Sequence, residues 1–198
     1  MNKPDITRLL ELQRLLQSFN EIDRRVHRNH GGKMRHENDT EHSYNLTMTA
    51  WFLTPHFPEL DKDLLIRYAL VHDLVEIHAG DTYIYGTNEE LSTKADREKV
   101  AAEKLHKDWP DFSEMHELIE DYEAGANPEA RFIYALDKIM PIMQIYIHEG
   151  YTWQKEGITA EQLHANKYDK VKLSPEVLPY YDEPYELLLA APDFIPPK

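Results

Sequence analysis

The sequence carries histidines and aspartates in an order that suits a metal centre without sulfur ligands. His42 stands alone, His72 and Asp73 are adjacent, and Asp137 follows much later in the chain. Cysteine is absent, which excludes disulfides, thiolate ligands and cysteine nucleophiles. Imidazole and carboxylate groups together can bind a divalent ion, and they leave open whether it is Mn, Co, Mg, Fe, Ni or Zn. The residue types therefore suggest a site for one divalent metal ion.

The helix predicted to carry His42 has a recognisable start. Asn38 or Asp39 can cap its first turn, and Glu41 stands three residues after Asn38, as in a capping box. Pro55 stops the apolar series that follows. His42 is therefore expected in the first turns of this helix.

The other three residues lie on helices predicted to be buried. The segment 61–79 is apolar on nearly every side and is followed by Gly80, and a second apolar helix covers about 128–149. Further helical patterns cover about 5–20, 92–108, 113–124, 160–169 and 175–190. The residues that follow the helix predicted over about 5–20 are expected to form a loop, and the sequence shows no convincing pair of strands. The predicted fold class is all-α.

Three separate helices are thus expected to point polar side chains into apolar surroundings. Burying an ionised carboxylate without a partner costs several kcal/mol, and one divalent cation would neutralise both aspartates. The alternative is that the histidines are hydrogen-bonded core residues and that the aspartates pair with arginine or cap helices. That alternative is the better interpretation for any one residue alone, and metal binding is the better one for the four together.

Length and composition indicate a globular protein. A chain of 198 residues with 41% hydrophobic residues fits one domain, 1–198, with a core over about 35–150 and C-terminal helices over about 158–190. No apolar run is long enough to span a membrane and no secretory signal is recognisable, so we expect a cytoplasmic protein that does not bind membranes. The net charge of −14 argues against nucleic-acid binding.

Positive charge is concentrated in one segment of this acidic chain, just before His42. Arginines stand at four positions there: Arg24, Arg25, Arg28 and Arg35. A guanidinium group can hold a phosphomonoester through two hydrogen bonds. For most of these residues individually, a solvated basic loop is the better interpretation. We nevertheless expect that one of the four binds a substrate phosphate.

The ligand order resembles that of the HD-domain phosphohydrolases, in which a His is followed by a His-Asp pair and a distant Asp. The resemblance is carried by the segments 35–42, 70–81 and 129–138. Its most specific part is the His-Asp pair followed at fixed spacing by Glu76 and by Gly80-Asp81. The chain is similar to the bacterial 5'-deoxynucleotidase branch and to its eukaryotic HD-domain-containing relatives.

The resemblance implies an HD-domain helical bundle, a homodimer, that hydrolyses nucleoside 5'-monophosphates with a preference for 2'-deoxy sugars. It also implies one divalent metal on the four residues and a water molecule as the nucleophile. The phosphate-binding arginine maps to Arg24 or Arg25. No Trp follows either arginine, which departs from the family pattern near the sugar.

By the same resemblance, Glu76 and Asp81 are catalytic or substrate-contacting residues. The spacing supports this role, because Glu76 is one helical turn after His72 and Asp81 follows the expected helix end. The alternative is that Glu76 pairs with a lysine or arginine and that Asp81 caps the next turn.

Two other functions remain open. One is an HD hydrolase of another phosphate ester, although Ile77 after Glu76 and Val75 before it do not fit guanosine-tetraphosphate hydrolases or cyclic-dinucleotide phosphodiesterases. The other is a binding protein that has lost turnover. The sequence also leaves open whether a set of apolar side chains is core or dimer surface, namely Leu118, Ile142, Ile145, Tyr180, Tyr181 and Tyr185.

Overall fold

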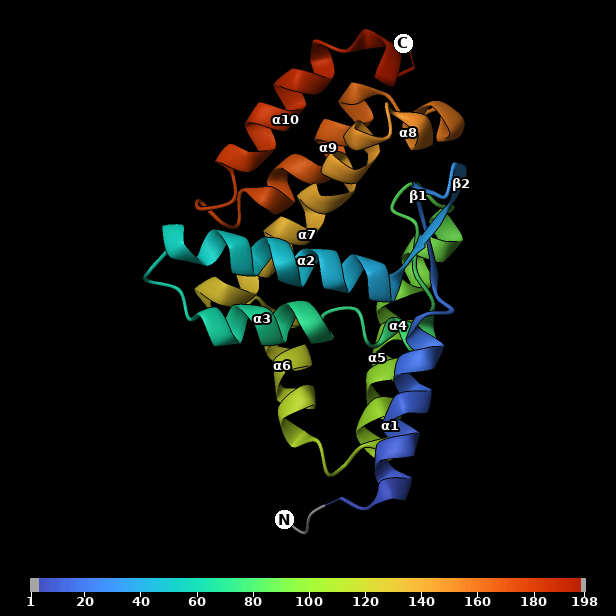
Figure 1. Ribbon diagram of the computed structural model, residues 1–198, viewed down its shortest axis with the longest axis vertical. Coiled ribbons are helices and arrows are strands. Elements are labelled where there is room, and N and C mark those ends of the chain that lie inside the picture. Colours follow the sequence, from blue (N-terminus) through green and yellow to red (C-terminus); the bar gives the residue numbers. More distant parts are fainter. Residues whose placement is uncertain (1–3, 197–198) are drawn as a thin grey trace.

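Helices α2 (Asp39–Leu53) and α3 (Lys62–Val71) pack side by side across the middle of the molecule (Figure 1). The computed structural model describes residues 4–196. The other elements are, in chain order, α1 (Ile6–Phe19), β1 (Asp23–His30), β2 (Lys33–Asn38), η1 (Thr54–His56), α4 (Glu76–Ala79), α5 (Asn88–Asp108), α6 (Ser113–Ala124), α7 (Pro128–Ile147), α8 (Tyr151–Glu156), α9 (Ala160–Val171), α10 (Pro179–Leu189) and η2 (Pro192–Phe194). Helices dominate, which confirms the predicted all-α class. None of the helices in this range is long and apolar enough to cross a bilayer.

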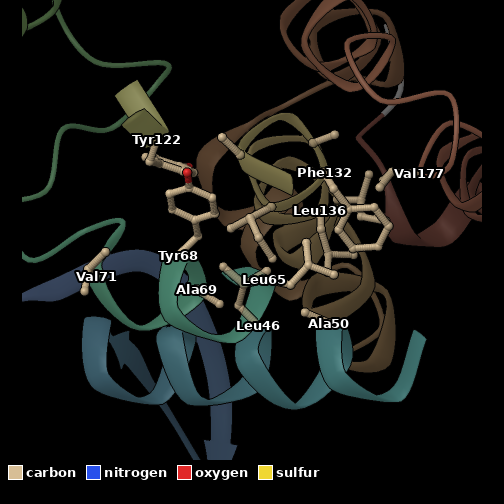
Figure 2. Close-up of a cluster of buried hydrophobic side chains, with 14 of the residues drawn as sticks. Leu46, Ala50, Leu65, Tyr68, Ala69, Val71, Tyr122, Phe132, Leu136 and Val177 are labelled. Atoms are coloured by element: carbon tan, nitrogen blue, oxygen red, sulfur yellow. The ribbon is translucent and has the colours of Figure 1, made fainter. Parts of the chain in front are cut away.

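The core lies where α7 packs against both α2 and α3. Leu46 from α2, Leu65 and Tyr68 from α3, and Phe132 and Leu136 from α7 meet there (Figure 2). Each is at most 1% exposed, and burying a side chain of this size contributes about 1.5–3 kcal/mol. The three helices that carry the predicted ligands are therefore anchored to one another by apolar packing.

The segment before α2 is a β-hairpin, and the prediction of a loop without strands was wrong there. β1 and β2 pair antiparallel, and the pair His30 and Lys33 encloses a two-residue turn. Gly31 and Gly32 both have positive φ, 59° and 84°, as a tight hairpin turn requires. The alternation of apolar and polar residues that predicts strands is missing because β1 is rich in arginine and histidine. The glycine pair was the available signal.

The single helix predicted over 61–79 is interrupted. α3 ends at Val71, and α4 begins at Glu76. In between, the backbone N–H groups of Leu74 and Glu76 donate to the carbonyl three residues earlier, at 3.1 and 2.9 Å, which winds the chain more tightly than an α-helix. Gly80 ends α4 with a φ of 74°. His72 and Asp73 therefore lie in the turn after α3 and not within one continuous helix over 61–79.

The apolar residues left open by the sequence fall mainly into the core. Leu118, Ile142, Ile145 and Tyr181 are 8% exposed or less. The helix α8 was not predicted from the sequence. It packs against β1 and α7 and lies with α9 and α10 at the end of the molecule opposite α1 and α6 (Figure 1).

Candidate metal centre and substrate site

Four potential ligand side chains converge where α2, α7 and the end of α3 meet. His42 Nε2 is 2.9 Å from Asp137 Oδ1 and 4.0 Å from Asp73 Oδ2. His72 Nε2 is 3.0 Å from Asp73 Oδ2. One atom from each of the four lies within 4.8 Å of all the others. The structure thus brings the four predicted ligands together.

The ring of His72 is held in an orientation that suits ligation. Its Nδ1 lies 3.0 Å from the carbonyl oxygen of Ala69, and a proton on Nδ1 would donate a hydrogen bond to that oxygen. In this tautomer, the lone pair of the ring is on Nε2. His72 Nε2 is buried and has no hydrogen-bond partner, although Asp73 is near. An unsatisfied buried nitrogen is costly unless it binds something. This orphaned atom fits a metal ion.

His42 also has the properties of a ligand. Burial, together with the positive charge of Arg24, lowers the pKa of His42 to about 4, so its ring is neutral at pH 7. A neutral imidazole is the form that binds metals. Its Nδ1 is 3.8 Å from a carboxylate oxygen of Glu37, which is itself 3% exposed. A carboxylate behind a ligating histidine orients the ring.

Both aspartates of the cluster are ionised. Burial raises the pKa of Asp137, but Lys138 and His42 outweigh it and hold the pKa well below its usual value. Lys138 Nζ donates to Asp137 Oδ2 at 2.5 Å. Burial likewise raises the pKa of Asp73, and His72 and Arg24 lower it further than burial raises it. Two ionised carboxylates and two imidazoles are a donor set that fits one divalent ion.

Arg24 is the arginine that reaches the cluster. Its Nη1 donates to Asp39 Oδ1 at 2.9 Å and to Asp73 Oδ2 at 2.8 Å, and its Nη2 is 4.0 Å from Asp137 Oδ1. The side chain is 12% exposed. Burial lowers the pKa of Arg24, and the two nearest carboxylates raise it by more. A charged guanidinium therefore stands beside the candidate metal centre.

The other three predicted arginines form no ion pair with the cluster, although Arg25 lines a cavity beside it. Arg25 lies with its guanidinium carbon 5.9 Å from the centroid of the Tyr83 ring. Arg28 and Arg35 both pair with Glu41, at 3.1 and 2.5 Å. A register shift near the start of β1 breaks the alternation of faces, so Arg28 does not share the side of Arg24. The structure does not bring Arg28 or Arg35 to the cluster.

Glu76 is buried next to the cluster and not at its rim. It is 5% exposed, and its Oε2 has no hydrogen-bond partner. Together with Asp39 and Asp73 it forms a second group of carboxylates whose oxygens lie within 4.8 Å of one another. Burial, followed by the charges of Asp73 and Asp39, raises the pKa of Glu76 well above its usual value. Such a carboxyl group can hold a proton.

The cluster opens into two cavities that share a boundary. The polar cavity is lined by His72, Asp73, Glu76 and Asp137 among others. The apolar cavity is lined by residues that include Tyr83, Tyr85, Ile142, Trp153 and Leu163. The residues that line both are Arg24, Asp81, Thr82, Ile84, Pro141 and Lys167. A charged group and an apolar group joined by a short link could therefore be bound together.

Asp81 lies at this boundary. Burial raises the pKa of Asp81, Arg24 lowers it, and Asp73 raises it, and the net pKa is above the usual value. Its position follows from Gly80, whose positive φ turns the chain at the end of α4. Asp81 is therefore placed to contact a group that spans the two cavities.

Three polar residues near the cluster were not predicted from the sequence as part of the site. Asp39 was considered only as a cap, but it is 0% exposed and binds Arg24, and its spacing of three from His42 on one helix was the available signal. Glu37 precedes this helix and gave no signal. Lys167 lies on α9, far away in sequence, and no local pattern marks it.

The chain matches a known family over most of its length. The family model described as HD domain matches residues 19–178. A Homo sapiens protein named 5'-deoxynucleotidase HDDC2 is 31% identical over 145 residues, which cover 71% of this chain and 68% of that protein. A Schizosaccharomyces pombe protein named 5'-deoxynucleotidase hdd1 is 25% identical over 122 residues, which cover 57% of this chain and 59% of that protein.

A solved structure is similar over nearly the whole chain. It is described as a predicted metal-dependent phosphohydrolase from Magnetospirillum magnetotacticum MS-1. The TM-score is 0.80 at 28% sequence identity, and the alignment covers 96% of each chain. The resemblance inferred from the motifs thus agrees with the sequence and the structure comparisons.

Proposed function

This chain belongs to the HD domain family, and from that premise we propose that it is a metal-dependent phosphoric monoester hydrolase acting on nucleoside 5'-monophosphates. The names of the similar proteins support this substrate class. The observation that carries the proposal is the convergence of four ligand side chains beside one cavity, which Arg24 and Glu76 also line. A cavity with a cation, a metal centre and a proton donor suits hydrolysis of a phosphate ester.

The metal ligands in this proposal are His42, His72, Asp73 and Asp137. When bound, a divalent ion supplies Lewis-acid polarisation of the phosphate and lowers the pKa of a water molecule. The unpartnered His72 Nε2 and the neutral ring of His42 support the ligand set. The set does not select among the divalent metals named above.

The remaining residues have roles in binding and proton transfer. Arg24 binds the phosphoryl oxygens from beside the metal centre, where it already contacts Asp73. Glu76 gives its proton to the 5'-oxygen of the nucleoside as the bond from phosphorus to that oxygen breaks, because an alkoxide is a poor leaving group. Asp81 accepts a hydrogen bond from a sugar hydroxyl and holds the ester in position for attack. The apolar cavity takes the nucleoside.

The decisive experiment combines elemental analysis with a phosphate-release screen over deoxynucleoside and ribonucleoside 5'-monophosphates. We expect about one transition metal per chain, nucleotide hydrolysis by the wild type, and loss of both in Asp73→Ala, because that change removes a ligand. Full metal content in Asp73→Ala would refute the ligand set. A metal-loaded wild type that hydrolyses no nucleotide would refute the substrate class.

We also propose that the chain is one domain, acts in the cytoplasm and forms a homodimer. One contiguous apolar core supports the single domain. An exposed apolar stripe on α2 supports self-association: Tyr44, Met48, Trp51 and Phe52 are between 42% and 76% exposed. Residues at these spacings share one helix face, and an exposed apolar patch commonly marks an interface.

A further inference from the structure

The side chain of Lys167 is largely buried, and its amino group has no ionic partner among residues 4–196. Lys167 lies on α9 and is 6% exposed. None of the ion pairs and none of the hydrogen bonds found between residues 4 and 196 involves its side chain, whereas the neighbouring Lys138 is paired with Asp137. Burying an ammonium group without a counter-charge costs several kcal/mol. Its position therefore needs a physical explanation.

The surroundings of Lys167 increase this cost. Burial is the largest influence on its pKa, and the positive charges of Lys138, Lys170 and Arg24 act in the same direction. Only Asp137 among the main influences opposes them, and the pKa of Lys167 falls to about 7. Asp137 forms no ion pair with Lys167, and its two oxygens contact His42 and Lys138 instead. In the described part of the chain, no carboxylate forms an ion pair with Lys167.

The position of Lys167 shows where an anion would lie. Lys167 lines the polar cavity together with His72, Asp73 and Asp137, and it also lines the apolar cavity. Arg24 is the other cation that lines both. Arg24 comes from β1 and Lys167 from α9, so the two charges reach the boundary from different elements. In the proposed function, this boundary is where the phosphate of a nucleotide would join its nucleoside.

We propose that Lys167 is a phosphate-binding residue, which together with Arg24 holds the phosphoryl group of the substrate. The inference rests on the proposed function, which places a phosphate ester in this cavity. The phosphate would supply the missing counter-charge. Its binding would therefore offset the free-energy cost of burying Lys167, which increases the affinity for phosphate. Arg24 is already held by two carboxylates, whereas Lys167 is free to respond to the ligand.

Inorganic phosphate and the metal-loaded protein provide the test. Lys167→Met removes the charge and keeps much of the apolar stem, Lys167→Gln removes the charge and stays polar, and Lys167→Arg keeps the charge. Lys172→Met is the matched control, because Lys172 follows the same helix and forms an exposed pair with Asp169. Phosphate affinity is measured by calorimetry, and the melting temperature is recorded for every variant.

We expect Lys167→Met and Lys167→Gln to weaken phosphate binding by at least about tenfold, since each loses a charge-assisted hydrogen bond. Lys167→Arg should restore most of the affinity, and Lys172→Met should match the wild type. The melting temperature of Lys167→Met should be equal to or above that of the wild type, because the variant no longer buries an unpaired charge. A residue with a purely structural role would show the opposite pattern.

The outcomes separate this inference from the proposed function. If Lys167→Met and Lys167→Gln bind phosphate as the wild type does, the inference is wrong, whatever substrate the enzyme hydrolyses. If the wild type hydrolyses no nucleotide but its phosphate affinity depends on Lys167, the inference stands and only the substrate class fails. A loss of phosphate binding that Lys167→Arg does not restore in part would also overturn it.

Discussion

At the scale of single residues, Arg24 differs from the other arginines of its segment because it is buried and paired before any substrate arrives. It contacts Asp39 and Asp73, so its guanidinium group is fixed in place, and little conformational freedom is left to lose on binding. This arrangement makes Arg24 the phosphate-binding arginine in our proposal and removes Arg28 and Arg35 from that role.

We therefore predict that Arg24→Ala lowers kcat/KM for nucleotides by roughly 10- to 150-fold, the loss of one hydrogen bond from a charged donor. Most of the effect should appear in KM. Arg67→Ala is the control, since Arg67 lies on α3 in an exposed pair with Glu114. Steady-state kinetics of Arg24→Ala, Arg25→Ala and Arg67→Ala measure the difference. If all three variants have the same kcat/KM, Arg24 does not bind the substrate phosphate.

Glu76 has the burial that a proton donor needs. We predict that Glu76→Gln retains metal and substrate binding but loses most of kcat on a nucleoside monophosphate. On p-nitrophenyl phosphate the loss should be much smaller, because that leaving group needs no proton. Equal losses on both substrates would mean that Glu76 does not protonate the leaving group.

The pH dependence gives a second measurement of the same role. The pKa of Glu76 is raised by burial and by Asp73 and Asp39, so its protonated form persists to higher pH than in a free carboxylic acid. An acid catalyst is active below its pKa, so nucleotide hydrolysis should fall as the pH rises through that value. This decrease of kcat at high pH should be absent from the pH profile of Glu76→Gln.

At the scale of elements, the interrupted helix between α3 and α4 determines where the acidic residues lie. Tight turns after Val71 and the positive φ of Gly80 place Glu76 inside the site and Asp81 at the cavity boundary. A continuous helix would have distributed these residues differently, because its side chains advance by a constant angle.

We predict that Gly80→Ala destabilises the protein by about 1–3 kcal/mol, because a side chain at its backbone angles, φ 74° and ψ 150°, is strained. No neighbouring atom lies within 4 Å of the added Cβ, so the cost comes from the backbone alone. Activity at a temperature where the variant is folded should also fall, since Asp81 moves.

The matched control for this prediction is Gly157→Ala, at another positive-φ glycine with free space, φ 69°, between α8 and α9. Chemical denaturation and kcat are measured for both variants. Gly157→Ala should lose stability but retain kcat. If Gly80→Ala also retains kcat, the turn does not position Asp81 for catalysis.

At the scale of the whole molecule, the candidate metal centre joins α2 and the turn after α3 to α7, which lies much later in the sequence. A divalent ion on His42, His72, Asp73 and Asp137 would bind the folded chain and not the unfolded one, so it would stabilise the fold. At 100 times its dissociation constant, the ion contributes about 2.7 kcal/mol.

We predict that Mn²⁺ at this concentration raises the melting temperature of the metal-free protein by about 5–10 °C. His72→Ala should abolish the shift, and His56→Ala, at an exposed histidine, should retain it. Differential scanning fluorimetry with and without a chelator measures both. An unchanged shift in His72→Ala would locate the stabilising ion elsewhere.

The exposed stripe on α2 gives a prediction for assembly. Trp51 and Phe52 are 53% and 76% exposed, and two copies of this face can pair around a twofold axis. Phe52→Glu should convert the homodimer to a monomer in analytical ultracentrifugation, while Phe112→Glu, at another exposed phenylalanine, should not. A wild-type monomer would refute the homodimer.

What the sequence determined by itself was local or was carried by residue type. The capping box of Asn38 and Glu41 set the start of α2, and Gly80 marked the end of α4, because these signals act within one helical turn. The absence of cysteine and the order of His and Asp predicted the candidate donor set. Apolar periodicity was sufficient for α1, α6 and α7, since their apolar faces repeat regularly.

Only the tertiary structure decided which residues meet. The hairpin β1–β2 carries polar side chains in place of an alternating apolar pattern, and its pairing selects Arg24 over Arg28. Lys167 reaches the same cavity from α9, more than a hundred residues away along the chain. Such contacts depend on how the helices pack around the core, and no sequence window short enough to show a period contains both partners.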